Sequence, residues 1–309
     1  MFFAISGLLI TWLMLLENGR NGRVNLRNFY ARRALRILPV YITFLCVLAA
    51  LQIATPFGQS PSAWLGNLTF TTDFLQDRPW TSGHLWSLAV EEQFYILWPS
   101  LFVLCGVGRD MRMSAWILMP PILIAPVVRV VSYLELSPVI FRPWLSDFSF
   151  LNNVDSLAIG CACGIILARR PDAVKLWIAT WPRFIPCVAL LMIAIPYILS
   201  RLFLLGVLTV PFGYSLQISG IAILMMQSLL YPEFGIYKLL NHPLICRVGL
   251  LSYSVYIWQQ IFCTEPRMFG LEKAWWLSFP TWLIPVFFVA MASYYCLEQP
   301  LLRLRVHFR

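Results

Sequence analysis

Long apolar stretches alternate with short polar segments along almost the whole chain. Most stretches approach the roughly 20 apolar residues that a helix needs to cross a bilayer. Backbone groups in lipid must be paired within the protein, and no alternating strand pattern is present, so the pattern predicts a transmembrane helical bundle. Nine spans are predicted: Met1–Leu16, Ile37–Thr55, Trp86–Gly106, Ala115–Leu134, Asn153–Ala168, Phe184–Ser200, Val207–Tyr231, Val248–Cys263 and Trp275–Leu297.

The composition supports an all-α, polytopic membrane protein. Of the 309 residues 60% are hydrophobic and 12% are charged, whereas a soluble domain carries about 25% charged residues. No internal repeat or low-complexity linker divides the chain, so residues 1–309 are expected to form a single domain. The 8 cysteines form no CxxC pair and are interpreted as small apolar side chains rather than metal ligands or disulfides.

The loops differ sharply in charge. If the nine predicted spans alternate across the membrane, the loops on one side of it hold most of the 23 Lys and Arg: Arg20, Arg23, Arg27, Arg32, Arg33, Arg36, Arg109, Arg112, Arg169, Arg170, Lys175, Arg183, Lys238, Arg247, Arg303, Arg305 and Arg309. The opposite loops hold only Arg78, Arg142, Arg201, Arg267 and Lys273. The positive-inside rule places the first group, and the C-terminus, in the cytoplasm. It also accounts for the net charge of +9 without nucleic acid as a partner.

This orientation puts Met1 outside the cytoplasm. The first span begins abruptly, without a polar flank, at MFFAISGLLI. We therefore expect one further helix, starting in the cytoplasm, to precede this chain.

Two adjacent carboxylates interrupt an apolar span in the run HLWSLAVEEQFYILWP, which covers residues 84–99. A charged side chain at the bilayer centre costs about 2.5–3.5 kcal/mol on insertion scales, so it normally faces a partner or a polar cavity. His84 and Glu91 are seven residues apart and would share one helix face, whereas Glu92 lies about 100° around the helix. One interpretation is that a glutamate pairs with a basic residue and thereby orders the helical bundle. The other is a functional polar cavity.

Two groups of charged residues allow similar alternatives. Arg129 and Asp155 lie near the outer ends of two spans and could form an ion pair, either as a packing clamp or as part of a site. Arg32, Arg33 and Arg36 precede the second span. They could anchor the helix at lipid headgroups or recognise a cytosolic polyanion, because guanidinium groups bind phosphates well.

Six motifs resemble signatures of the membrane acyltransferase-3 family, in that family's order. They are FFAISGLLI from Phe2, NFYARRALRILPVY from Asn28, HLWSLAVEEQFYILWP from His84, NNVDSLAIGCACGIIL from Asn153, VGLLSYSVYIWQQ from Val248 and LEQPLLRL from Leu297. The resemblance covers the entire chain. It implies a ten-span bacterial inner-membrane protein that moves an acyl group, commonly acetyl, from cytosolic coenzyme A to a carbohydrate such as lipopolysaccharide or peptidoglycan. The family's first helix, with a histidine regarded as catalytic, has no counterpart in this sequence.

The resemblance and the residues together predict a site. His84 with Glu91 or Glu92 would orient the acceptor or move its proton. Arg32 and its two neighbours in the cluster would hold the phosphates of acyl-CoA, which is the donor substrate rather than a permanently bound cofactor. Further residues are expected to pack helices or line the cavity: Ser6, Gly7, Arg129, Asp155, Tyr253 and Glu298. No metal-binding or nucleotide-binding motif is present, and the expected partners are a glycan or lipid-linked saccharide and membrane lipids.

Two other functions compete with this interpretation. Intramembrane Glu, Asp and Arg also suit a proton-coupled secondary transporter, although carriers usually show internal repeats. The chain could also be a truncated, non-catalytic relative of the family.

Overall fold

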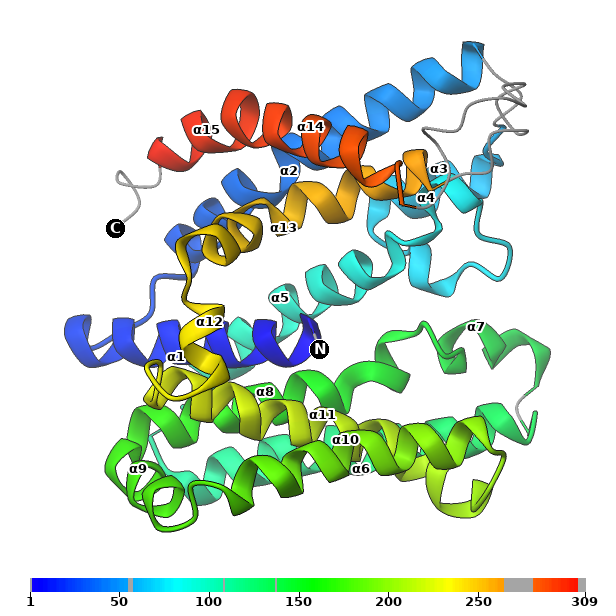
Figure 1. The fold of residues 1–309 in the computed structure, drawn as a ribbon. Coiled ribbons are helices and arrows are strands. Elements are labelled where there is room, and N and C mark those ends of the chain that lie inside the picture. Colours follow the sequence, from blue (N-terminus) through cyan, green and yellow to red (C-terminus); the bar gives the residue numbers. More distant parts are fainter. Residues whose placement is uncertain (1, 55–57, 108, 137, 264–279, 305–309) are drawn as a thin grey trace. The chain divides into compact units, whose positions relative to one another are not determined.

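The computed structural model describes residues 2–54, 58–107, 109–136, 138–263 and 280–304, and this part of the chain is helical without a strand. The helices of nine residues or more are α1 (Phe2–Asn21), α2 (Leu26–Ala54), α3 (Pro61–Thr69), α5 (Trp86–Leu104), α6 (Met111–Tyr133), α8 (Phe150–Arg169), α9 (Pro171–Thr180), α10 (Phe184–Arg201), α11 (Gly206–Leu230), α13 (Pro243–Phe262) and α14 (Leu283–Ser293) (Figure 1). The shorter ones are η1 (Thr72–Phe74), α4 (Trp80–Gly83), η2 (Val139–Phe141), α7 (Arg142–Leu145), α12 (Ile236–Leu240), the π-helical turn η5 (Tyr294–Glu298) and α15 (Gln299–Arg303).

Six helical segments in the described part are long and apolar enough to cross a membrane. They are α1, Leu26–Ile53 of α2, α6, the segment Val139–Arg169 that contains α8, α10 and α11. The expectation of an all-α membrane protein is therefore confirmed, whereas the count of nine spans stays a prediction. The other three predicted spans correspond to α5, α13 and α14, the last in part because residues 264–279 lie outside the described residues. In α5, Glu91, Glu92 and Gln93 lower the hydropathy.

Two helices begin well before the spans predicted from their apolar runs. α2 starts at Leu26 instead of Ile37, so the arginine cluster is part of the same helix as the apolar segment. α13 starts at Pro243 instead of Val248. Leucine and arginine are good helix formers whether or not the segment lies in lipid, and proline is favoured at the first position of a helix. The apolar runs therefore predicted only the apolar part of each of these two helices and not its full length.

The described chain divides into two compact units. The first comprises Met1–Val24 and Trp86–Lys238, and the second comprises Asn25–Leu85 and Leu239–Arg309. The expectation of a single domain stays a prediction. Each unit is built from two separated parts of the sequence, so its core depends on contacts between distant residues.

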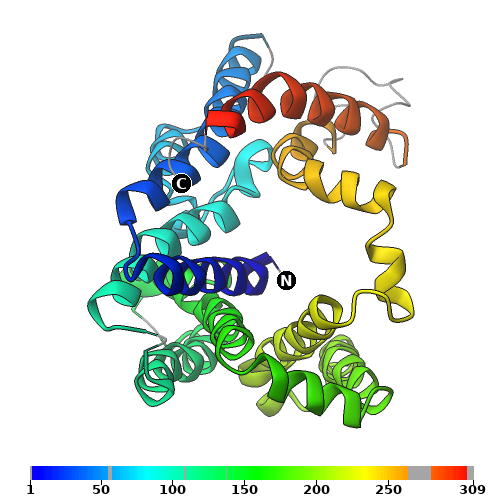
Figure 2. The same ribbon diagram turned by 90° about the vertical axis from the view of Figure 1, so that its left-hand side faces the viewer.

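In the first unit, α1 packs along α8 at very short range (Figures 1 and 2). Glycines make this approach possible. A Cβ atom on Gly7 would lie 2.2 Å from the carbonyl oxygen of Leu157, and one on Gly160 would lie 2.2 Å from that of Ala4. Gly164 meets α1 one turn further along, at Leu8. Small residues on both faces let the two backbones touch, which is a common way for helices to associate in lipid.

The short helix α9 closes one end of this unit. Val174 and Ile178 lie one turn apart and are buried against α8 and α10. The buried cluster consists of Leu8, Cys163, Leu167, Val174, Ile178, Ile185, Ala222 and Met226. α10 and α11 lie side by side next to it (Figure 1). A single apolar core therefore connects α1, α8, α9, α10 and α11.

In the second unit, α13 packs against α2 and α14. The Tyr253 hydroxyl donates a hydrogen bond of 2.8 Å to the carbonyl oxygen of Ile37 on α2. The hydroxyl of Tyr41 on α2 donates one of 2.6 Å to the carbonyl oxygen of Asn67 on α3. These bonds hold the middle of α2 between the N-terminal and C-terminal parts of the unit.

Candidate active site

His84 lies in the turn that joins α4 to α5, in the second unit. Its Nε2 atom is 3.2 Å from the carbonyl oxygen of Ile257 on α13. The hydroxyl of Tyr256 donates a hydrogen bond to the backbone oxygen of His84. The ring also makes edge contacts with Phe44, at 5.7 Å between centroids, and with Tyr256, at 5.2 Å. α13 and α2 thus hold the imidazole on several sides.

These contacts determine which imidazole nitrogen can act as a base. A carbonyl oxygen only accepts, so the Nε2 atom facing Ile257 must carry the proton, and Nδ1 then carries the lone pair. Nδ1 is buried and has no hydrogen-bond partner among the described residues. Burial lowers the pKa of His84 to about 4, so the ring is neutral near pH 7. The second unit therefore presents a buried imidazole lone pair.

Two more buried polar atoms of the second unit lack a partner among the described residues. They are the Oγ atom of Ser82 and the Nε1 atom of Trp258. Phe44 touches both His84 and Trp258, with a centroid separation of 5.6 Å from the latter. Buried polar atoms are nearly always bonded, so this group is a candidate place for a hydroxyl-bearing ligand. Neither Ser82 nor Trp258 was predicted from the sequence as a site residue.

Glu91 belongs to a polar cluster of the first unit. The Ser6 hydroxyl on α1 donates a 2.8 Å hydrogen bond to Oε1 of Glu91. The Tyr95 hydroxyl, one turn along α5, lies 3.2 Å from the other carboxylate oxygen and 3.1 Å from the Ser6 hydroxyl. Ser6 was expected to pack helices or line the cavity. Tyr95 was not predicted as a site residue, although its i,i+4 spacing from Glu91 is visible in the sequence.

Glu92 is part-buried on the same helix. The predicted common face of His84 and Glu91 assumed one continuous helix, but α5 begins at Trp86. His84 belongs to the second unit, whereas Glu91 and Glu92 belong to the first. Their cooperation therefore stays a prediction.

Arg129 and Asp155 form a buried ion pair between α6 and α8, with 2.7 Å between Nη2 and Oδ1. The guanidinium also donates to the side-chain and backbone oxygens of Asn152, to the backbone oxygen of Pro211 and to Ser215. Ser215 in turn bonds the second carboxylate oxygen of Asp155, at 2.5 Å. The network joins α6, α8 and α11.

This network uses the whole hydrogen-bonding capacity of Arg129. A guanidinium has five N–H donors, and the structure gives five hydrogen bonds from its three nitrogens. The ring of Tyr214 lies 5.0 Å from the guanidinium carbon. Since no donor remains for a ligand, the geometry favours a helix clamp over a binding role.

The arginine cluster lies on α2 in the second unit. Arg32 and Arg33 are part-buried, and Arg36 is exposed. The charge of Arg36 interacts favourably with the carboxylate of Glu298. Glu298 is buried at the end of η5 and accepts a hydrogen bond from Ser254 on α13. Glu298 therefore links the last helix to α13 and lies close to one of the three arginines.

The comparisons with known proteins agree with the motifs. A family model described as an acyltransferase domain matches residues 1–298. The "Peptidoglycan O-acetyltransferase OatA" of Listeria monocytogenes is 23% identical over 97% of this chain and 50% of its own length. The Bacillus subtilis protein named "Putative peptidoglycan O-acetyltransferase YrhL" is 24% identical over 97% of this chain and 49% of its own length. The chain thus spans about half the length of these relatives. No solved structure matches it.

Proposed function

Because this chain belongs to the acyltransferase family whose model matches residues 1–298, we propose that it is a membrane O-acyltransferase that moves an acyl group, most simply acetyl, to a carbohydrate hydroxyl. The family match is the observation that carries this proposal. The helices that are long and apolar enough to cross a membrane support it, since a protein that spans the bilayer can bind a donor from one side and an acceptor from the other.

The acceptor is a cell-envelope glycan. Two similar proteins carry peptidoglycan in their names, so peptidoglycan is the first acceptor to test. Lipopolysaccharide or another lipid-linked saccharide is the second, because all three present sugar hydroxyls to a membrane enzyme. Identities of 23–24% leave room for a different glycan.

The donor is acyl-CoA, bound through its phosphates by Arg32, Arg33 and Arg36. Guanidinium groups form strong, often bidentate hydrogen bonds with phosphate oxygens. Arg32 and Arg36 are one turn apart and share a helix face. Within this cluster, the charge of Arg36 also interacts favourably with the carboxylate of Glu298.

His84 is the proposed base in the second unit. As the sugar oxygen attacks the thioester carbonyl, Nδ1 takes the hydroxyl proton. The carbon–sulfur bond then breaks and the coenzyme A thiolate leaves. The proton held on Nδ1 passes to this thiolate, which restores the thiol and the neutral imidazole. The hydrogen bond to Ile257 supports this role because it directs the lone pair to Nδ1. The Nε1 atom of Trp258 would donate to the same acceptor sugar.

Glu91 is the competing candidate, in the first unit, with Glu92 beside it. A carboxylate can accept a proton from a sugar hydroxyl as well as an imidazole can. Glu91 already accepts a hydrogen bond from Ser6 and lies within bonding distance of the Tyr95 hydroxyl. Those bonds suit a structural link between α1 and α5 equally well, so the two roles must be separated by experiment.

The test is transfer of radiolabelled acetyl from acetyl-CoA to peptidoglycan fragments by the purified protein in proteoliposomes. Wild type should label the glycan. His84→Gln keeps a side-chain N–H that can bond Ile257 but removes the Nδ1 base, and should lower kcat by about 100-fold or more. His242→Gln is the matched control, because His242 is exposed at the start of α13, and should behave as wild type.

Glu91→Gln separates the competing roles. A loss of kcat in this variant with normal activity in His84→Gln would transfer the base to Glu91. Glu135→Gln is its control, since the side chain of Glu135 is exposed and forms an exposed ion pair with Arg142. A wild-type protein that labels neither peptidoglycan nor lipopolysaccharide from acetyl-CoA would contradict the proposed function.

A further inference from the structure

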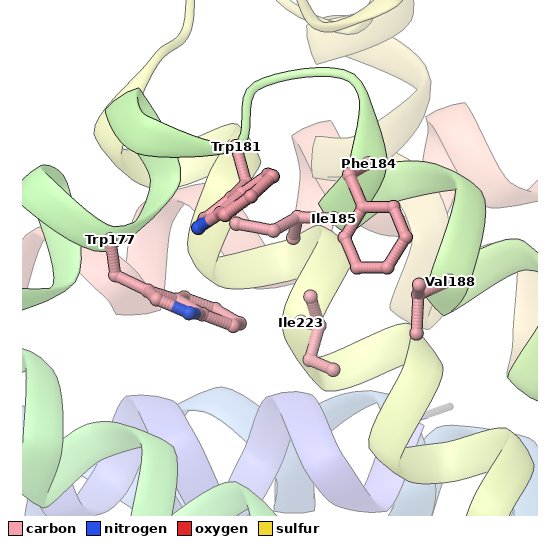
Figure 3. Close-up of a pocket in the computed structure, with 6 residues that line it drawn as sticks. All are labelled: Trp177, Trp181, Phe184, Ile185, Val188 and Ile223. Atoms are coloured by element: carbon pink, nitrogen blue, oxygen red, sulfur yellow. The ribbon is translucent and has the colours of Figure 1, made fainter.

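An apolar pocket opens at one end of the first unit, and none of the residues that line it belongs to the candidate active site. Its volume is about 290 Å³. Figure 3 shows the side chains that line it facing a common space; they are Trp177, Trp181, Phe184, Ile185, Val188 and Ile223. They come from α9, the turn after it, α10 and α11. Ile185 belongs to the buried cluster beneath the pocket, and Ile223 packs against it.

The mouth of the pocket is formed by large apolar side chains that are open to the surroundings. The exposed fractions of Trp177, Trp181 and Phe184 are 48%, 55% and 64%. Exposing such side chains to water would cost roughly 25 cal/mol of free energy for each Å² of apolar surface. Tryptophan is enriched where membrane proteins meet the headgroup region. A mouth of this composition is typical of a surface that faces the bilayer interface.

The shape of α9 supports this position. Its ten residues rise about 15 Å, half of the roughly 30 Å hydrocarbon core, so it cannot span the membrane. It follows α8 and precedes α10, both of which belong to segments apolar enough to cross. Val174 and Ile178 face the protein, and Trp177 lies on the open side. The Tyr231 hydroxyl on the turn after α11 bonds the backbone of Lys175 and holds α9 in place.

Basic residues flank the lining residues of the pocket in the sequence. Arg183 lies between two lining residues in the sequence, Trp181 and Phe184, and Lys175 precedes Trp177 by two residues. Arg169 and Arg170 end α8 just before α9. These four side chains are exposed, and the nearby exposed acids are Asp172 and Glu233. The surroundings of an uncharged pocket thus carry an excess of positive charge.

We propose that this pocket is a binding site for an anionic phospholipid, with one acyl chain between the two tryptophans and the headgroup phosphate against Lys175 and Arg183. An amphiphile of this kind matches both parts of the site. A purely apolar ligand would leave the cations unused, and a soluble anion would leave the pocket unfilled. Basic pockets between transmembrane helices bind anionic headgroups in the same way. The inference does not rest on the proposed acyl transfer.

The test is native mass spectrometry of the full chain in detergent, with phosphatidylglycerol and phosphatidylcholine at equal concentration. Wild type should retain phosphatidylglycerol preferentially. Val188→Trp fills the pocket without changing charge and should lower this retention about tenfold or more, since it removes most of the buried apolar contact. Leu190→Trp is the matched control, because Leu190 is exposed on the same helix and does not line the pocket.

Lys175→Gln with Arg183→Gln tests the charge. Each basic residue near an anionic surface contributes about 1 kcal/mol, so the double variant should lose about tenfold or more of the preference for phosphatidylglycerol. Arg112→Gln with Arg201→Gln is the control for the same change of net charge.

Ile223→Phe fills less of the pocket and replaces Val188→Trp if that variant does not elute as a single species. Equal retention of the two lipids by wild type, or equal retention of phosphatidylglycerol by the pocket variant and Leu190→Trp, would overturn the proposal.

Discussion

Arg129 and Asp155 lie 26 residues apart in the sequence and 2.7 Å apart in the structure, with exposed fractions of 7% and 0%. Their bonds reach α6, α8 and α11 at once, through Asn152, Pro211 and Ser215. Removal of one charge leaves the other charge buried and unpaired, and this strongly destabilises a folded protein.

Asp155→Asn should therefore lower the free energy of unfolding by about 3–5 kcal/mol. The measurement is denaturant-induced unfolding of the purified protein in detergent. Glu135→Gln breaks the exposed pair with Arg142, whose atoms are 3.5 Å apart, and should change stability by at most about 1 kcal/mol. Similar small effects for the two variants would show that Arg129 and Asp155 do not clamp the helices.

Gly160→Ala should separate α1 from α8. The new Cβ atom would lie 2.2 Å from the backbone oxygen of Ala4, and a backbone cannot move aside as a flexible side chain can. We expect a loss of about 1–3 kcal/mol of stability, as for other overpacked sites, measured by thermal unfolding. Gly19→Ala on α1 meets nothing within 4 Å and should be neutral or stabilising by up to about 1 kcal/mol, because alanine favours helix. A stable Gly160→Ala protein would contradict the packing.

The depressed pKa of His84 makes stability depend on pH. The folded value is about 4 and the unfolded value is about 6.5. Between these values the unfolded chain binds more protons, so stability falls as the pH drops from 6.5 towards 4. Unfolding free energies measured at several pH values should show a fall about 1–3 kcal/mol larger in wild type than in His84→Gln. Parallel curves for the two proteins would mean that His84 titrates normally.

The arginine cluster can be tested without catalysis. Arg32→Gln with Arg36→Gln should weaken acetyl-CoA binding about tenfold or more, because charge-assisted bonds to phosphate are lost. Isothermal titration calorimetry in detergent measures the affinity. Arg109→Gln with Arg112→Gln removes the same charge from another exposed segment and should leave binding unchanged. Unchanged binding in the Arg32 and Arg36 variant would remove these residues from the donor site.

The apolar runs were sufficient to predict the helical class and the approximate position of each long helix. Apolar length is a local property, and a chain in lipid can satisfy its backbone only by forming helices or closed barrels. The positions of Arg129 and Asp155 inside apolar segments also pointed to a partner, because isolated charges are costly there. The six motifs in order indicated the family, which the match to residues 1–298 then established.

Sequence alone could not pair residues that are far apart along the chain. Only helix packing brings Ser6 to Glu91, His84 to Ile257 and Ser254 to Glu298. These contacts depend on which helices are neighbours and on their rotation about their axes, and a periodic pattern within one helix leaves both open. The tertiary structure therefore decided that Glu91 is held by hydroxyl groups, that the lone pair of His84 is on Nδ1, and that Arg129 has no donor left for a ligand.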